Sequence, residues 1–117
     1  MEVVDVLRDF FLGSIKIHIL YHASIEPIYG AFLMEELASH GYDISPGTLY
    51  PTLKQLHKDE LLEKYEEKVE GKIRKYYVIT DKGQQILKEG KQQVQELAEE
   101  ILGKDWRKIS DESIKEK

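Results

Sequence analysis

The sequence predicts an α+β fold that is mostly α, with a single β-hairpin between the third helix and the last one. Apolar residues recur every three or four positions over most of the chain, which is the pattern of helices with one buried face. Residues 62–79 differ, because branched and aromatic residues flank a Glu-Gly pair there, as in two strands joined by a tight turn. With 117 residues and no internal repeat, the chain has room for one structural unit.

The composition favours a cytoplasmic protein. Apolar residues make up 41% of the chain and charged residues 33%, an ordinary balance for a soluble protein. The chain has no cysteine, which excludes disulfides, thiolate nucleophiles and cysteine metal sites and suits a reducing compartment. No apolar run reaches the roughly 18 residues that a membrane span needs, and no secretion signal begins the sequence.

The net charge of −5 argues at first against a nucleic-acid partner, but the charge is unevenly spread. Residues 1–44 carry −5, residues 45–80 carry +1 and residues 81–117 carry −1. The middle segment holds seven lysines and arginines, so it can present a local basic face.

Two helices are expected before the middle segment. The first covers residues 2–24, where Leu12, Ile15, Ile19 and Ala23 form one apolar stripe, and Gly13 is a candidate break within it. Pro27 ends this segment. The second helix covers residues 29–40, with Phe32, Leu33, Leu37 and Ala38 facing inward, and Gly41 suits the left-handed position that closes a helix.

A third helix is expected over residues 45–59. Ser45 is its cap and Pro46 its first residue, where the missing N–H costs nothing. Leu49, Leu53 and Leu56 fall on one side and face the core. The other side carries small, hydroxyl, amide and cationic residues: Gly47, Thr48, Tyr50, Pro51, Lys54, Gln55 and Lys58.

The remaining elements are a hairpin and a long helix. The strands are residues 62–69 and 72–79, and Thr80 ends the second strand and caps a helix over 81–102 or further. This helix has a short heptad seam, the pattern of a helix that pairs with another helix. Its members are Leu87, Gly90, Val94, Leu97 and Ile101.

The order of three helices and a hairpin is that of a winged helix-turn-helix, in which the third helix enters the DNA major groove and the hairpin is the wing. The exposed residues of helix 45–59, together with Ser45, suit base and phosphate contacts. Lys72, Arg74 and Lys75 on the wing suit phosphate contacts. The alternatives are a solvated helix face and an edge strand that its lysines protect from aggregation.

Two motifs carry a resemblance. Ser-Pro-Gly-Thr-Leu-Tyr-Pro-Thr-Leu at residues 45–53 and Arg-Lys-Tyr-Tyr-Val-Ile-Thr-Asp-Lys-Gly at 74–83 resemble the PadR family of transcriptional regulators, over about residues 10–102. The resemblance implies a homodimeric repressor whose C-terminal helix, with part of the N-terminal helix, forms the dimer interface. It also implies that Thr48, Tyr50 and Lys54, with the three wing cations, face DNA.

The chain differs from the family pattern at two places. Glu60 replaces the glycine that usually ends the third helix, and the same left-handed turn would cost roughly 1 kcal/mol there. The C-terminal helix is single and short, as in the smaller branch of the family. We therefore expect residues 1–80 to form the DNA-binding domain and residues 81–117 a dimerisation helix with a charged tail, in one structural unit.

Other sites have weaker support in the sequence. Some small family members bind flat aromatic effectors, and Phe10, Phe11, Tyr21 and Trp106 are the candidates here, although ordinary packing explains them as well. His18 and His22 lie four residues apart on a helix, a spacing that lets two imidazoles meet one metal ion. No third ligand stands nearby in sequence, although folding could bring His40 or His57 near, and no metal or other cofactor is expected. No phosphate loop, nucleophile elbow or zinc-protease motif indicates an enzyme.

A second function fits the charge of the chain. A winged helix can serve as a protein–protein interaction module that does not bind DNA, with the acidic residues 1–44 as its docking surface. The net charge favours this interpretation, and the basic wing beside helix 45–59 disfavours it. Steep salt dependence of DNA binding would separate the two, because counterion release requires phosphate contacts.

Overall fold

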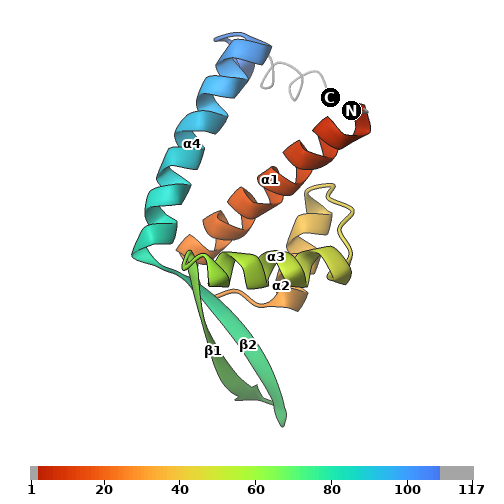
Figure 1. Ribbon diagram of the computed structural model, residues 1–117, viewed down its shortest axis with the longest axis vertical. Helices are drawn as coiled ribbons and strands as arrows, with labels where there is room; N and C mark the ends of the chain where they lie inside the picture. The colour runs from red at the N-terminus through yellow and green to blue at the C-terminus, as the bar shows by residue number, and fades with distance from the viewer. Residues whose placement is uncertain (1–2, 109–117) are drawn as a thin grey trace. The chain divides into compact units, whose positions relative to one another are not determined.

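The computed structural model describes residues 3–108, with side chains from residue 5 onward. The predicted order of elements is confirmed (Figure 1). The elements are α1 (Val3–Ile25), α2 (Gly30–Ser39), α3 (Pro46–Lys58), β1 (Leu62–Val69), β2 (Lys72–Ile79) and α4 (Asp81–Leu102). A first compact unit ends at Leu87 and so includes the first turns of α4, whereas the rest of α4 belongs to a second unit. Within residues 3–108, no helix is long and apolar enough to cross a bilayer.

Helix α1 is continuous, and the predicted break at Gly13 is wrong. A glycine inside a helix costs only about 1 kcal/mol relative to alanine, which the packing of the helix on both sides of it can offset. Ile15 and Ile19 of the predicted stripe are fully buried, and Leu20 on the adjoining face is buried as well. Two faces of α1 therefore pack against the rest of the first unit.

The core of the first unit lies between the three helices and the base of the hairpin. Helix α2 contributes Leu33 and Leu37, and α3 contributes the three leucines predicted to face inward, Leu49, Leu53 and Leu56. Ala38, also predicted inward, is exposed, because it follows Leu37 by one residue and so points about 100° away from it. Gly41 has φ +84°, the left-handed turn expected after α2.

The hairpin has the predicted strands and turn. Val69 pairs with Lys72 across the two-residue turn, in which Glu70 and Gly71 have φ of 52° and 80°. Positive φ at both central residues is the type I′ geometry that matches the twist of a hairpin. The hairpin projects away from the three helices (Figure 1).

A short segment before α2 pairs with the second strand of the hairpin, a contact that the sequence did not predict. Ile28, in the connection between α1 and α2, pairs with Tyr77 of β2 by two hydrogen bonds, of 3.0 and 2.8 Å. Ile28 is fully buried and Tyr77 nearly so. The base of the wing is thereby fixed to the start of α2.

The end of α3 is a left-handed turn at Glu60, so the turn that the family usually makes at glycine forms here in spite of the departure from the family pattern. Glu60 has φ 63°, and its N–H donates to the His57 carbonyl while that of Leu61 donates to the Leu56 carbonyl, both at 3.0 Å. This pair of bonds is the Schellman motif, which closes many helices and usually has glycine at this position. A glutamate therefore adopts the conformation that favours glycine.

Thr80 holds this turn and also begins α4. Its hydroxyl donates to the Glu60 carbonyl at 2.6 Å and accepts from the Gly83 N–H at 2.9 Å, which is the predicted helix cap. A Cβ atom at Gly83 would lie 2.7 Å from Ile79 Cγ1 and would meet the Leu61 carbonyl, so only glycine allows this close approach. The end of α3 and the start of α4 are thus tied together.

Helix α4 ends where the sequence predicted. Leu102 is its last residue, and Gly103 follows with φ +91°. A further helical turn includes Trp106, whose ring lies 5.2 Å from the Arg107 guanidinium. Residues 109–117 of the predicted charged tail lie outside the described residues.

The strain at Glu60 predicts a stabilising substitution. We expect Glu60→Gly to raise the free energy of unfolding by about 1 kcal/mol, because glycine adopts positive φ without the Cβ penalty. Urea denaturation monitored by circular dichroism measures the change. Glu63→Gly is the control, since Glu63 lies in β1 and a glycine there should destabilise the protein. Equal effects of the two substitutions would contradict a strained turn at Glu60.

Candidate nucleic-acid interface

Helix α3 presents its polar side outward because its three leucines anchor the opposite side in the core. Gly47, Pro51, Lys54 and Lys58 are all exposed, as predicted. Pro51 lies within the helix, which nevertheless stays continuous from Pro46 to Lys58. Small residues near the start and lysines near the end give this face a shape that can enter a groove.

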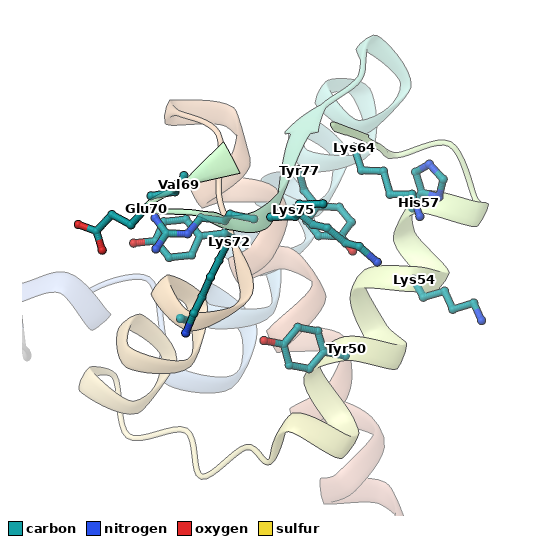
Figure 2. A pocket seen from close by; sticks show the side chains of 13 residues that line it. Tyr50, Lys54, His57, Lys64, Val69, Glu70, Lys72, Lys75 and Tyr77 are labelled. Carbon is teal, nitrogen blue, oxygen red and sulfur yellow. The ribbon is translucent and has the colours of Figure 1, made fainter. Parts of the chain in front are cut away.

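A hollow of about 880 Å³ lies between α3, the start of α2 and the hairpin. Figure 2 shows Tyr50, Lys54 and His57 along α3, with Lys64, Lys72 and Lys75 coming from the hairpin. We call this hollow the basic groove. Its lining residues are Tyr29, Ala31, Tyr50, Lys54, His57, Lys64, Val69, Glu70, Lys72, Ile73, Arg74, Lys75 and Tyr77.

The basic groove concentrates positive charge in an acidic protein. Its lining has five lysines and arginines and one carboxylate, Glu70, which gives +4 with His57 neutral. The whole chain carries −5. Four of the predicted DNA-contacting cations line this one hollow: Lys54, Lys72, Arg74 and Lys75. Lys64 and His57 line it as well, although they were not among the predicted DNA-contacting residues.

The wing cations stand on both faces of the hairpin. The register places Arg74 opposite Glu67 and Lys75 opposite Glu66, and neighbouring residues of a strand point to opposite faces. Cross-strand glutamates of this kind reduce the local positive charge. The wing therefore needs α3 beside it to make a strongly basic surface.

Arg74 is held in place by aromatic side chains. Its guanidinium carbon lies 4.1 Å from the centre of the Tyr29 ring, a cation–π contact. Tyr29 in turn meets Tyr76 edge-on at 5.5 Å, and Tyr76 stacks on Tyr65 at 5.3 Å. A hydrogen bond with the Tyr76 side chain raises the pKa of Arg74 above its already high ordinary value. A cation fixed in this way is preorganised to meet a phosphate.

Tyr50 of α3 lines the basic groove and packs against the start of α2. Half of the residue is exposed, and its ring lies over Gly30, where an added Cβ would come within 2.6 Å of a ring carbon. Burial raises the pKa of the neighbouring Tyr77, and Tyr50 adds to this shift. Gly30 thus leaves room for the Tyr50 ring that lines the groove, and no signal in the sequence predicted this contact.

Most of the predicted residues of α3 lie outside the basic groove. Ser45 occupies the cap position before α3, but the predicted capping bond of its side chain is wrong. Its hydroxyl donates to the Thr48 hydroxyl at 3.4 Å and not to a backbone group. The Gln55 amide donates to the Asp59 carboxylate at 2.9 Å. None of these three residues lines the basic groove, and neither do Gly47, Pro51 and Lys58, so the contact of all six with DNA stays a prediction.

The predicted seam of α4 is mostly exposed. Val94, Leu97 and Ile101 are exposed along the second unit, and Gly90 is partly exposed. Leu87 differs, since it is 3% exposed and packs in the core of its own chain. Its side chain therefore has almost no surface to offer a second subunit.

The aromatic effector candidates have neighbours of their own. Phe11 packs against Tyr42 at 5.3 Å and Tyr21 meets His22 edge-on at 5.1 Å, whereas Phe10 is exposed. Their role in effector binding stays a prediction.

Comparison with known proteins decides the family. The model of the transcriptional regulator PadR-like family matches residues 19–89, more than half of the chain. The chain belongs to this family. Its winged helix and its wing are therefore those of a PadR-like protein, and it is a transcriptional regulator and not an enzyme.

Individual relatives agree with this assignment. The PadR-like regulator is 43% identical over 97 residues to the transcriptional regulator Rv3488 of Mycobacterium tuberculosis, covering 83% of this chain and 91% of the relative. The crystal structure of a PadR family regulator from Eggerthella lenta is similar with a TM-score of 0.73 and 32% identity, over 85% and 88% of the two chains. A PadR-like regulator from Bacillus cereus gives 0.70 and 37%, over 76% and 88%.

The contact between Gly30 and Tyr50 predicts a non-additive pair of substitutions. We expect Gly30→Ala alone to lower the free energy of unfolding by about 1 kcal/mol, because the new methyl group meets the Tyr50 ring. In a Tyr50→Ala background the same change should be neutral or stabilising, since alanine is the better helix former. A double-mutant cycle in urea measures the difference, and additive effects would contradict the contact.

Proposed function

We propose that this PadR-like regulator is a homodimeric repressor that binds double-stranded DNA at a pseudo-palindromic operator. The basic groove is the observation that carries the proposal. Five cations against one carboxylate meet there between a helix with a small-residue start and a hairpin. A helix of this kind fits the major groove, and a basic hairpin beside it fits the phosphate backbone or the minor groove.

The side chains divide into two roles. Lys72, Arg74 and Lys75 on the wing, with Lys58 on α3, would contact phosphates and supply most of the affinity. Thr48, Lys54 and Gln55 would contact base edges. To do so, the Gln55 side chain would break its hydrogen bond to Asp59 and form one to a base. Ser45, Gly47, Tyr50 and Pro51 would line the close approach of the helix start.

The exposed seam of α4 supports dimerisation. Val94, Leu97 and Ile101 repeat at heptad spacing and stay exposed in the single chain, a costly arrangement unless another helix covers them. A two-fold dimer would present two α3 helices to successive major grooves, about 34 Å apart. In this proposal residues 1–80 bind DNA and residues from 81 onward dimerise.

By analogy with the family, we also propose that the protein represses transcription and is cytoplasmic. A dimer bound across a promoter would exclude polymerase. A small aromatic effector that changes the distance between the two α3 helices would release the operator. The sequence offers Phe10, Phe11, Tyr21 and Trp106 as candidates for that effector site.

The acidic first third of the chain favours one other function, a winged-helix module for protein assembly without DNA. Residues 1–44 carry −5, which suits a basic protein partner. The basic groove has no role in that alternative. Selection of bound fragments from random DNA at about 0.15 M salt tests both functions.

We expect this selection to return a two-fold symmetric motif with half-sites about ten base pairs apart. Such a motif would also identify the operator. No enrichment by a protein shown to be folded and dimeric would contradict DNA binding and favour the protein-assembly function.

Removal of one wing charge should change the salt dependence of binding. We expect Arg74→Gln to weaken binding to all DNA sequences and to lower the slope of log affinity against log salt by about 0.9 per subunit. Fluorescence anisotropy at several salt concentrations measures the slope. Lys16→Gln, a charge removal on the exposed side of α1, is the control and should leave the slope unchanged.

Gln55→Ala separates base contacts from phosphate contacts in the same assay. It should leave the slope unchanged and relax specificity at one base position per half-site. Equal losses on specific and random DNA would exclude Gln55 from base reading, and an unchanged slope in Arg74→Gln would exclude Arg74 from phosphate contact.

A charge in the seam of α4 should separate the subunits. We expect Leu97→Glu to weaken dimerisation by at least tenfold, because the substitution buries a carboxylate between apolar helices. Analytical ultracentrifugation measures the association. Gln92→Glu adds the same charge on the opposite side of α4, at about 100° per residue, and should leave the dimer intact. A Leu97→Glu protein that dimerises as the wild type does would exclude this seam as the interface.

A further inference from the structure

Three imidazoles and one carboxylate meet between α1 and α2, away from the residues that line the basic groove. His18 and His22 lie one turn apart on α1. Glu36 lies on α2, and His40 is the residue that ends this helix. The sequence suggested only the first pair, and the fold adds a second pair with the same spacing of four residues. We call these four residues the histidine cluster.

The ligand atoms of three members lie at distances that suit a metal ion. His40 Nε2 is 3.2 Å from Glu36 Oε1, and His22 Nε2 is 3.6 Å from the same oxygen. The potential ligand atoms of these three residues all lie within 4.8 Å of one another. Two ligands on a tetrahedral zinc ion, each about 2.0–2.1 Å from the metal, are about 3.4 Å apart.

His18 lies beside these three residues. Its ring centre is 5.5 Å from that of His40 and 6.3 Å from that of His22. Burial lowers the pKa of His18, and His40 and His22 lower it further, while Glu36 acts in the opposite direction.

The frame of the cluster is rigid and accessible. Both pairs stand on helices whose apolar faces pack in the same core, so their backbones are fixed before any ion binds. The side chains of His22, Glu36 and His40 are 13%, 31% and 50% exposed, which leaves a path for an ion from solvent. Two nitrogens and one carboxylate oxygen are the ligand set of many zinc sites with an open fourth position.

We propose that His22, Glu36 and His40 form a binding site for one divalent transition-metal ion per chain, of the zinc, cobalt or nickel kind, with His18 available as a fourth ligand. Imidazole donors favour these ions over magnesium and calcium, which require oxygen ligands. The ion would bridge α1 to the end of α2, directly before the loop that leads into α3. The site does not depend on the proposed DNA-binding function.

Titration of the untagged full-length protein with Co²⁺ tests the site directly, since four-coordinate Co²⁺ has intense visible absorption bands. We expect the bands to saturate at one ion per chain and to disappear when Zn²⁺ is added. Glu36→Gln should weaken binding at least tenfold. Glu35→Gln, the neighbouring exposed glutamate on the same helix, is the matched control and should bind as the wild type does.

A second readout separates lost binding from lost folding. Zn²⁺ should raise the thermal midpoint of the wild type and of Glu35→Gln but not that of Glu36→Gln. His40→Gln, at the most exposed of the three ligands, tests the site again if Glu36→Gln does not fold. Absence of the intense bands in the wild type, or equal Zn²⁺ affinity in the wild type, Glu36→Gln and His40→Gln, would overturn the proposal.

Discussion

The geometry of the proposed interface depends on the two hydrogen bonds that the Thr80 hydroxyl makes. This hydroxyl accepts from the Gly83 N–H, which starts α4, and donates to the carbonyl of Glu60, which ends α3. The Thr80 N–H also donates to the Leu61 carbonyl at 3.1 Å. One residue therefore fixes the end of the helix that would read DNA, the end of the wing and the start of the last helix. The left-handed strain at Glu60 is tolerated because these bonds determine the direction of the turn.

The basic groove results from two elements that are each only moderately basic. Helix α3 contributes Lys54 with Tyr50 and His57, and the hairpin contributes its cations with cross-strand glutamates that partly cancel them. The Ile28–Tyr77 pairing holds the hairpin base to the start of α2, which places both elements around one hollow. The concentration of positive charge in the groove is thus a property of the tertiary structure and of no single segment.

Local signals explain why so much of the fold could be predicted from the sequence. Gly41, the Glu70-Gly71 turn and Thr80 each mark a boundary through their own backbone or hydrogen-bonding preference, and the leucines of α3 mark its buried face. Long-range contacts carry no such signal. The burial of Leu87, the contact of Gly30 with Tyr50 and the approach of Glu36 and His40 to α1 all depend on packing between distant segments. The candidate DNA-binding residues could be chosen by their type, but which of them would line one groove could not be predicted.

The contrast in charge between the groove and the rest of the chain has a kinetic consequence. Since the whole chain carries −5 and the groove lining +4, the remaining residues carry −9. DNA is itself a polyanion, so most encounters in other orientations are repelled, and only those that present the groove are attracted. In the proposed function, such a protein would therefore associate weakly with DNA through the rest of its surface. Its search for an operator would proceed by many short collisions, with orientation as the first filter before any base is read.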